Sequence, residues 1–258
     1  MEKIILIVIV GLAWGSFLNV IIYRLPRRMS LVKPPSSCPH CHQRIRLYDN
    51  IPVLSFILLR GKCRTCKARI PLSYPLVEML TPVGFLLLHN QHPLDISFFA
   101  SCVFFSALIT LGFIDFYHQV LPDEITLPTL TLALIYSLFR PDLNLTQSLV
   151  GAVIGSGLLL FVYGAYYLLR KREGLGMGDV TMMLMIGAYL GWQLTLFTLI
   201  LASFGGALIG GTLILIKKKN LQYALPFGSF LAAASFVSLL WGEGIIASYL
   251  SLYKNMAP

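Results

Sequence analysis

The sequence predicts an all-α polytopic membrane protein with about eight transmembrane helices and a small cytoplasmic loop domain. The chain of 258 residues is 57% hydrophobic and 12% charged, with a mean hydropathy of +0.77. A soluble domain is usually about a quarter charged, so this composition excludes a large soluble enzyme. A transmembrane helix needs roughly 20 mostly apolar residues. Apolar runs of nearly this length recur along most of the chain, which indicates several membrane spans.

Apolar runs predict eight membrane spans, at residues 4–22, 73–89, 97–115, 124–139, 148–169, 180–192, 195–216 and 225–249. No small-residue cleavage pattern follows the first run, which predicts a retained helix rather than a signal peptide. The sixth run is short, and Pro128 predicts a kink in the fourth. These runs divide the chain into a first helix (1–23), a cytoplasmic four-cysteine loop (24–71) and a polytopic membrane domain (72–258).

The basic residues set the expected orientation. Of the twenty Lys and Arg residues, seventeen fall on one side if eight spans alternate: eleven in 24–71, with Arg170, Lys171, Arg172, Lys217, Lys218 and Lys219. Positive residues concentrate on the cytoplasmic side, so the loop should face the cytoplasm and both termini outward. Contact with anionic lipid headgroups accounts for the net charge of +9 without nucleic acid as a partner.

Two aspartates at span ends are the candidate catalytic residues. Asp115 ends the third span and Asp179 begins the sixth, so both lie at the cytoplasmic edge of the bilayer. Ionisable groups in spans are costly and mark functional sites. Two carboxyl groups that converge at one depth share a proton, which is the chemistry of aspartic proteases. Gly176 and Gly178 permit unusual backbone angles and close approach of an extended substrate peptide.

The residues alone leave alternatives open for these acids. Asp179 precedes a helical run and could be a plain N-cap. Asp115 could simply mark the membrane–water boundary, and Asp123 is near enough to be the partner in its place. Glu78, in the second span, is interpreted as the structural partner of a nearby cation.

The polar loop contains two Cys-x-x-Cys pairs, at Cys38 and Cys41 and at Cys63 and Cys66. This spacing predicts a tetrahedral zinc site with four thiolate ligands. Disulfides are the alternative, but a loop in the reducing cytoplasm disfavours them. A metal would stabilise a segment too small to bury much core. Basic residues around the cysteines are expected to help hold the thiolate charge: Arg44, Arg46, Arg60, Lys62, Arg64, Lys67 and Arg69.

Four motifs in order carry a resemblance that covers nearly the whole chain. Gly176–Asp179, G-M-G-D, resembles the GxGD signature of polytopic aspartyl proteases. Asp115–Thr126, D-F-Y-H-Q-V-L-P-D-E-I-T, resembles the first catalytic segment of bacterial type IV prepilin peptidases, and Gly15–Pro26 and Tyr74–Leu80 also match that family. The resemblance selects Asp115 over Asp123 as catalytic. Thr181 departs from it, at a place where many relatives carry a lysine.

The resemblance implies a membrane aspartic endopeptidase of the bacterial inner membrane. Its substrates would be prepilins or pseudopilins, whose leader it would cut at the cytoplasmic face before N-methylating the new terminus with S-adenosylmethionine. The methyl donor rests on the resemblance alone, because no glycine-rich turn between strand and helix is present. Two rivals are a proton-coupled transporter, which would place its acids at mid-span, and a non-catalytic secretion scaffold, which would tolerate Asn at Asp115 or Asp179.

Overall fold

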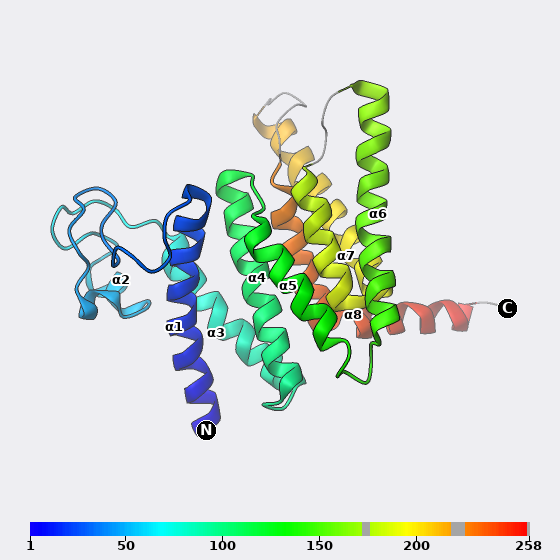
Figure 1. Ribbon diagram of the computed structural model, residues 1–258, viewed down its shortest axis with the longest axis horizontal. Coiled ribbons are helices and arrows are strands. Elements are labelled where there is room, and N and C mark those ends of the chain that lie inside the picture. Colours follow the sequence, from blue (N-terminus) through cyan, green and yellow to red (C-terminus); the bar gives the residue numbers. More distant parts are fainter. Residues whose placement is uncertain (172–175, 218–224, 257–258) are drawn as a thin grey trace. The chain divides into compact units, whose positions relative to one another are not determined.

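The computed structural model describes residues 1–171, 176–217 and 225–256 (Figure 1). Across these ranges the secondary structure is helical apart from two isolated β-bridges, which confirms the all-α prediction. The predicted basic positions Arg172, Lys218 and Lys219 lie outside the described residues. The elements are α1 (Glu2–Arg24), η1 (Leu25–Arg27), η2 (Leu47–Asn50), α2 (Leu54–Leu58), α3 (Ser73–Gln91), α4 (Ile96–His118), α5 (Asp123–Tyr136), α6 (Leu145–Arg170), α7 (Met177–Lys217) and α8 (Phe227–Met256).

Five helices of the described part are long and apolar enough to cross a membrane: α1 continued by η1, then α4, α6, α7 and α8. The protein is therefore a multi-pass membrane protein. Helices α3 and α5 coincide with two further predicted spans but are not among the five. Pro82 and the carboxyl group of Glu78 interrupt the apolar character of α3, and α5 has only 14 residues. The predicted count of eight spans stays a prediction.

Helix α7 contains two predicted spans and reverses direction between them. Gly191 interrupts the helix with φ 74° and ψ 169°, a backbone conformation that favours glycine. Gly151 of α6 packs on Gly187 and Gly191, whereas Gly155, one turn later, packs on Met183 and Thr195. From Gly151 to Gly155, the contact in the first part of α7 therefore moves to a lower residue number, and the contact in the second part moves to a higher one. The chain turns back at Gly191, two residues before the break that the hydropathy pattern predicted.

Side chains compensate the carbonyl groups that this reversal leaves without helical partners. The guanidinium of Arg140 donates to the carbonyl of Tyr189 at 2.8 Å, and its face lies over the rings of Tyr136 and Tyr189. The hydroxyl of Ser148 donates to the carbonyl of Ala188. Buried carbonyl groups without partners would be costly in a membrane, so these donors stabilise the turn.

The contact of Gly151 with α7 leads to a stability prediction. A Cβ atom at Gly151 would lie 2.4 Å from the carbonyl oxygen of Gly187, whereas one at Gly157 meets nothing within 4 Å. Gly151→Ala is expected to lower the free energy of unfolding by about 1–3 kcal/mol through overpacking. The matched control Gly157→Ala should be neutral or slightly stabilising, because alanine favours helix. Thermal unfolding of both variants in detergent tests this, and equal midpoints would contradict the close packing.

Two compact units divide the chain, Met1–Thr110 and Leu111–Pro258, and α4 crosses their boundary. In the first unit α1 packs against α3. Their register is antiparallel, since Gly11 lies against Pro82, Gly15 against Glu78, and the Asn19 amide donates to the Tyr74 carbonyl at 3.0 Å. The predicted division at residues 23 and 71 stays a prediction.

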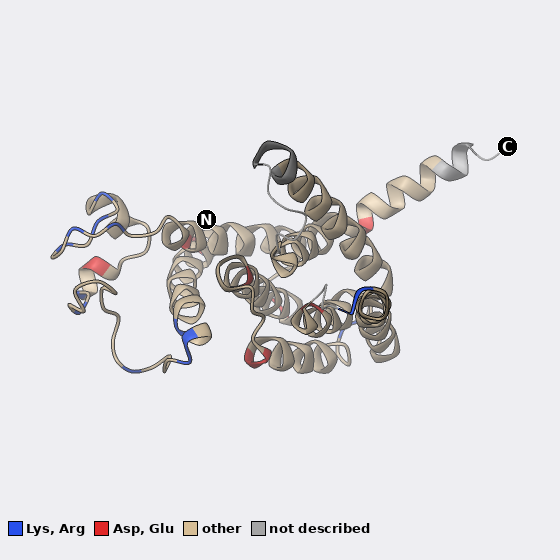
Figure 2. Cartoon of the chain, turned by 90° about the horizontal axis from the view of Figure 1, so that it is seen from above, with Lys and Arg blue, Asp and Glu red and all other residues tan. Residues whose placement is uncertain are grey.

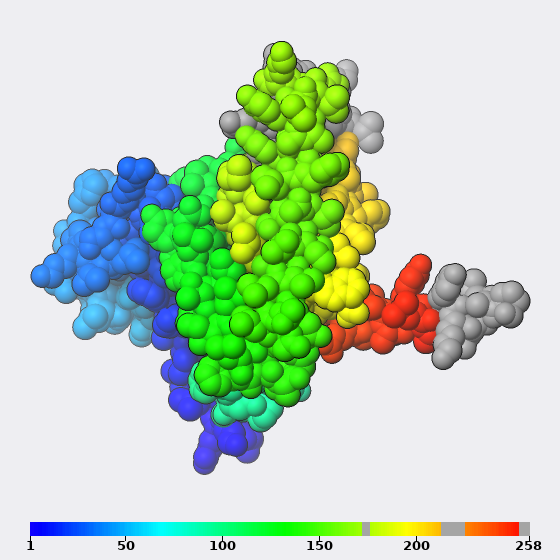
Figure 3. Space-filling view, turned by 45° about the vertical axis from the view of Figure 1, so that its right-hand side comes forward, coloured from blue at the N-terminus to red at the C-terminus, as the bar shows by residue number. Residues whose placement is uncertain are grey.

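The second unit is built around α7, which packs against α5, α6 and α8. The last turns of α4 lie against α8, where a Cβ at Gly112 would be 3.0 Å from that of Ala232. Helix α6 forms a continuous surface ridge (Figure 3). Large apolar side chains are exposed along it, including Val153, Phe161 and Leu169. Such a surface is suited to lipid contact.

Candidate active site and metal centre

Three helix ends of the second unit supply the polar groups of the candidate active site. Asp115 lies in the last turn of α4, Asp179 in the first turn of α7, and Ser229 in the first turn of α8. The two aspartates are only 5% and 7% exposed. Carboxyl groups are seldom buried to this extent without partners, so the groups around each one define the site.

Helix α8 holds the carboxyl group of Asp115. The backbone N–H of Ser229 donates to Oδ2 of Asp115 at 2.8 Å, and the Ser229 hydroxyl lies 3.2 Å from the same oxygen. That hydroxyl also donates to the carbonyl of Gly112 at 2.8 Å, one turn earlier in α4. The contact requires glycine at position 228, since a Cβ there would lie 3.0 Å from Oδ2 of Asp115. Ser229 therefore fixes both the carboxyl group and the helix that carries it.

Leu121 connects this group to Asp179. Its side chain lies 2.9 Å from the position of a Cβ at Gly228 and also 2.9 Å from that of a Cβ at Gly178. Gly178 directly precedes Asp179, so one leucine packs between the first turn of α7, which carries Asp179, and the first turn of α8, which binds Asp115.

The glycines before Asp179 serve through their size rather than their backbone angles. Gly191 and Gly61 are the glycines with positive φ in the described part of the chain, so the unusual angles expected at Gly176 and Gly178 are not adopted. The N–H of Asp179 donates to the Gly176 carbonyl at 3.1 Å, and a Cβ at Gly176 would lie 3.3 Å from Oδ2 of Asp179. The Thr181 hydroxyl donates to the Gly178 carbonyl at 3.0 Å.

Two other acids have hydrogen-bond partners of their own. Asp123 is exposed in the first turn of α5, where its carboxyl group accepts a hydrogen bond from the Thr126 hydroxyl at 3.3 Å. Glu78, in the first unit, is buried and its Oε2 accepts the backbone N–H of Val53 at 2.7 Å. Glu78 has the structural contact expected of it, but with a backbone amide in place of the predicted cation.

The four loop cysteines form the candidate metal centre. Cys38, Cys41, Cys63 and Cys66 place their sulfur atoms within 4.8 Å of one another. All are free thiols, and Sγ of Cys38 lies 3.7 Å from Sγ of Cys66, well beyond a disulfide bond. Four sulfur donors at this separation fit a tetrahedral ion. The cluster could hold a metal ion, and neither His40 nor His42 is part of it.

Both cysteine pairs are shaped by the same turn. The N–H of Cys38 donates to Gln43 and that of His42 to Cys38, while the N–H of Cys63 donates to Ala68 and that of Lys67 to Cys63. The residue after each second cysteine has positive φ, 56° at His42 and 59° at Lys67. Backbone N–H groups of Cys66 and Thr65 lower the pKa of the Cys63 thiol to about 7. A thiol that ionises readily is suited to metal binding.

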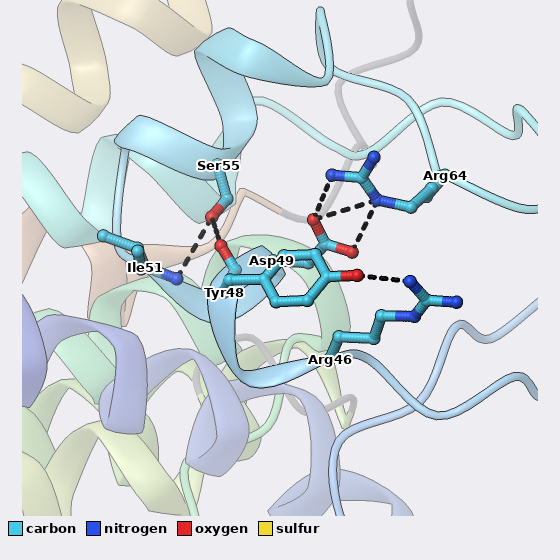
Figure 4. Close-up of polar contacts among 6 residues, drawn as sticks. All are labelled: Arg46, Tyr48, Asp49, Ile51, Ser55 and Arg64. Atoms are coloured by element: carbon cyan, nitrogen blue, oxygen red, sulfur yellow. Dashed lines mark hydrogen bonds and ion pairs between the residues drawn. The ribbon is translucent and has the colours of Figure 1, made fainter.

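The neighbouring arginines have other partners than the thiolates (Figure 4). Arg64 binds the carboxylate of Asp49 through two nitrogen atoms, at 2.6 and 2.8 Å, and Arg46 donates to the hydroxyl of Tyr48. The hydrogen bonds from Arg64 lower the pKa of the Asp49 carboxyl group. The prediction that basic residues help hold the thiolate charge stays a prediction, and the hydrogen bonds of Arg46 and Arg64 go to Tyr48 and Asp49. Figure 2 shows the Lys and Arg residues concentrated on this loop.

Sequence reasoning missed Ser229, Gly228 and Leu121. Ser229 lies 114 residues from Asp115 and is one of many serines, so no periodicity identifies it. The available signal is Pro226, Phe227 and Gly228 at the start of the last apolar run, which marks a helix beginning with a small residue.

Comparisons with known proteins identify the family of the chain. A model of the bacterial peptidase A24 N-terminal domain matches residues 9–92, and a model of the type IV leader peptidase family matches residues 102–211. A prepilin leader peptidase/N-methyltransferase of Stutzerimonas stutzeri is 38% identical over 271 residues, covering 95% of this chain and 93% of that protein. Those of Pseudomonas putida and Aeromonas hydrophila are each 36% identical, covering at least 95% of this chain and 93% of those proteins. No solved structure matches the chain.

Proposed function

Because the chain belongs to the type IV leader peptidase family, we propose that it cleaves the leader of prepilins or pseudopilins with Asp115 and Asp179 as its catalytic pair. One observation carries this assignment. Two buried carboxyl groups, one in the last turn of α4 and one in the first turn of α7, lie beside helix ends that Leu121 joins: it packs on Gly178, before Asp179, and on Gly228, beside Asp115. Asp123 is exposed and has a hydroxyl partner of its own, which supports Asp115 as the partner of Asp179.

The pair supplies acid–base chemistry. Two carboxyl groups that interact strongly share one proton and titrate as a unit. The ionised group takes a proton from a water molecule, which attacks the scissile carbonyl carbon, and the protonated group donates to the carbonyl oxygen. Ser229 keeps the Asp115 carboxyl group at a fixed position during these transfers.

We infer that this chemistry lies at the cytoplasmic edge of the membrane. Asp115 and Asp179 lie at the ends of apolar helices, and the basic loop, Arg170 at the end of α6 and Lys171 lie on the predicted cytoplasmic side of a bacterial inner membrane. A prepilin has a short basic leader before its apolar helix, so a membrane-embedded substrate would present the cleavage junction at this level. A transporter that relays protons would instead need acids near mid-span.

The proposed cofactors are a zinc ion, from the four cysteine sulfur atoms, and a methyl donor, from the family. Cys38, Cys41, Cys63 and Cys66 would hold Zn²⁺, which would stabilise the loop as a structural ion. The relatives are also N-methyltransferases by name, so we propose S-adenosylmethionine as methyl donor and the new amino terminus as acceptor. Among the described residues, no strand leads into a glycine-rich turn, and no residue is assigned to this donor.

Purified protein and a purified prepilin in detergent test the proposal. Mass spectrometry should show loss of the leader without S-adenosylmethionine, and a further gain of one methyl group when S-adenosylmethionine is added. Intact prepilin after incubation with folded protein, across several prepilins, would favour the scaffold or the transporter.

Ser229 leads to a prediction for the same assay. Ser229→Ala removes the hydroxyl whose single proton is shared between the Gly112 carbonyl and Oδ2 of Asp115. This change should lower kcat about 10-fold to 100-fold with KM little changed, since bonds to charged groups contribute ~1.5–3 kcal/mol. Ser229→Thr retains the hydroxyl and should recover most of the activity. Ser235→Ala is the matched control, because that hydroxyl donates only within α8, to the Leu231 carbonyl. Equal kcat for Ser229→Ala and Ser235→Ala would remove Ser229 from the mechanism.

A further inference from the structure

The contacts of the loop 24–71 with α1 and α3 indicate its depth in the membrane, since all three lie in the first unit. Arg24 ends α1, and its guanidinium donates to the carbonyls of Ser30 and Pro34 at 2.9 and 2.8 Å. The segment 30–34 therefore lies at the end of the helix. Gly15 lies nine residues earlier, about 13 Å along the axis at 1.5 Å per residue. Since the hydrocarbon core is about 30 Å thick, Gly15 lies well inside one leaflet when α1 spans the membrane.

Helix α2 (Leu54–Leu58) lies at the depth of Gly15 rather than at that of Arg24. The N–H of Val53, the residue before α2, donates to the carboxyl group of Glu78 at 2.7 Å. Glu78 in turn packs directly on Gly15, where a Cβ would be 2.9 Å from its Cα atom. Figure 1 shows α2 beside the middle of α1. The loop thus returns toward the membrane interior between its two cysteine pairs.

The outer face of α2 is apolar and uncovered by the described residues of this chain. Leu54, Ile57 and Leu58 are 48%, 63% and 71% exposed. Their spacing of three and four residues puts them on one side of the helix. Ser55 is buried on the other side, and its hydroxyl donates to the carbonyl of Tyr48. In water such a cluster would be unfavourable, whereas in a leaflet it contacts acyl chains.

The backbone around α2 also meets the requirement for membrane insertion. Polar backbone groups need partners where water is absent. Ser55 Oγ accepts the N–H of Ile51, Glu78 accepts that of Val53, and Gly61 donates to Phe56. Arg60 and Lys62 follow the helix and, through their long stems, can reach the headgroups.

We propose that α2 is a membrane-inserted segment whose Leu54, Ile57 and Leu58 lie among the acyl chains of the leaflet in which α1 ends. Continuity with α1 and α3 selects lipid as the occupant, because both helices flank the loop in sequence and share its depth. The loop is therefore anchored to the bilayer at a third point, between the two halves of the cysteine cluster. This places Glu78 in a structural role, as the acceptor that holds the inserted segment.

Quenching of a fluorescent amino acid in the full-length protein in lipid nanodiscs tests this insertion. The fluorophore replaces Ile57 in one variant, Val32 in a second and Ile9 in a third. Val32 is 83% exposed and lies between Ser30 and Pro34 at the end of α1, whereas Ile9 is 59% exposed within α1. All three positions are apolar and exposed, so they differ chiefly in expected depth.

Lipids brominated on their acyl chains should quench the fluorophore at residue 57 several-fold more than at residue 32, and nearly as much as at residue 9. Aqueous iodide should show the reverse order. Strong iodide quenching at residue 57, equal to that at residue 32, would overturn the proposal. Protection from both quenchers would overturn it too, since protein and not lipid would then cover α2. A reporter at Leu58 repeats the measurement should the Ile57 variant not fold.

Discussion

Asp115→Asn is expected to lower the rate of prepilin cleavage by about 10²-fold to 10⁴-fold, the usual contribution of a positioned acid or base. Asparagine retains the size of the side chain and can still accept the hydrogen bonds from Ser229, so packing at the α4–α8 contact should persist. It can neither carry the shared proton nor take one from water. Asp179→Asn should cause a loss of similar size. Single-turnover cleavage in detergent measures both.

Asp123→Asn is the matched control for these variants. It removes a carboxyl group eight residues after Asp115, from an exposed position where, in the described part of the chain, the carboxylate accepts a hydrogen bond from the Thr126 hydroxyl. Its cleavage rate should stay within a few-fold of the parent, and all variants should share one thermal midpoint. A large loss in Asp123→Asn with retained activity in Asp115→Asn would reverse the assignment.

Cys63→Ser is expected to abolish stoichiometric Zn²⁺ binding and to unfold the loop locally. Binding of structural zinc to small domains is worth about 10–16 kcal/mol, and a loop without much core depends on it. The metal content of the purified protein, by mass spectrometry, measures the first effect. Tryptic cleavage after the exposed basic residues of the loop measures the second, and should become much faster.

Cys102→Ser is the control for the metal prediction. Cys102 is also a free cysteine, but it is buried in α4 and is not part of the cluster. This variant should retain both the metal and the resistance of the loop to trypsin. Full zinc content in Cys63→Ser would contradict a site made of four thiolates.

The length of the apolar runs predicted where the long helices lie, but it predicted their ends less accurately. Hydropathy placed the break between the sixth and seventh spans two residues too late, because the position of the reversal depends on the positive φ of Gly191. Helix α8 runs to Met256, beyond the predicted end at residue 249, because hydropathy falls before the helix ends. The average polarity of the loop also conceals the apolar face of α2, formed by Leu54, Ile57 and Leu58.

The sequence predicts those residues of the candidate site whose type and spacing are themselves unusual. Two carboxyl groups at span ends and two Cys-x-x-Cys pairs are rare patterns, and each identifies its own residues. The partners of these groups are common residues from distant parts of the chain. Ser229 and Leu121 become recognisable only when α4, α7 and α8 are placed together. The Asp49–Arg64 pair was likewise hidden, because the loop contains many arginines and any of them could have been the partner.

The most direct test of the catalytic pair is the cleavage rate of the double variant Asp115→Asn/Asp179→Asn beside both single variants. All are measured in long single-turnover reactions on one prepilin. Groups that act as a unit are not additive, so the double variant should be about as slow as either single variant. Losses that multiply would show two independent roles, and full activity in any of the three would contradict the account.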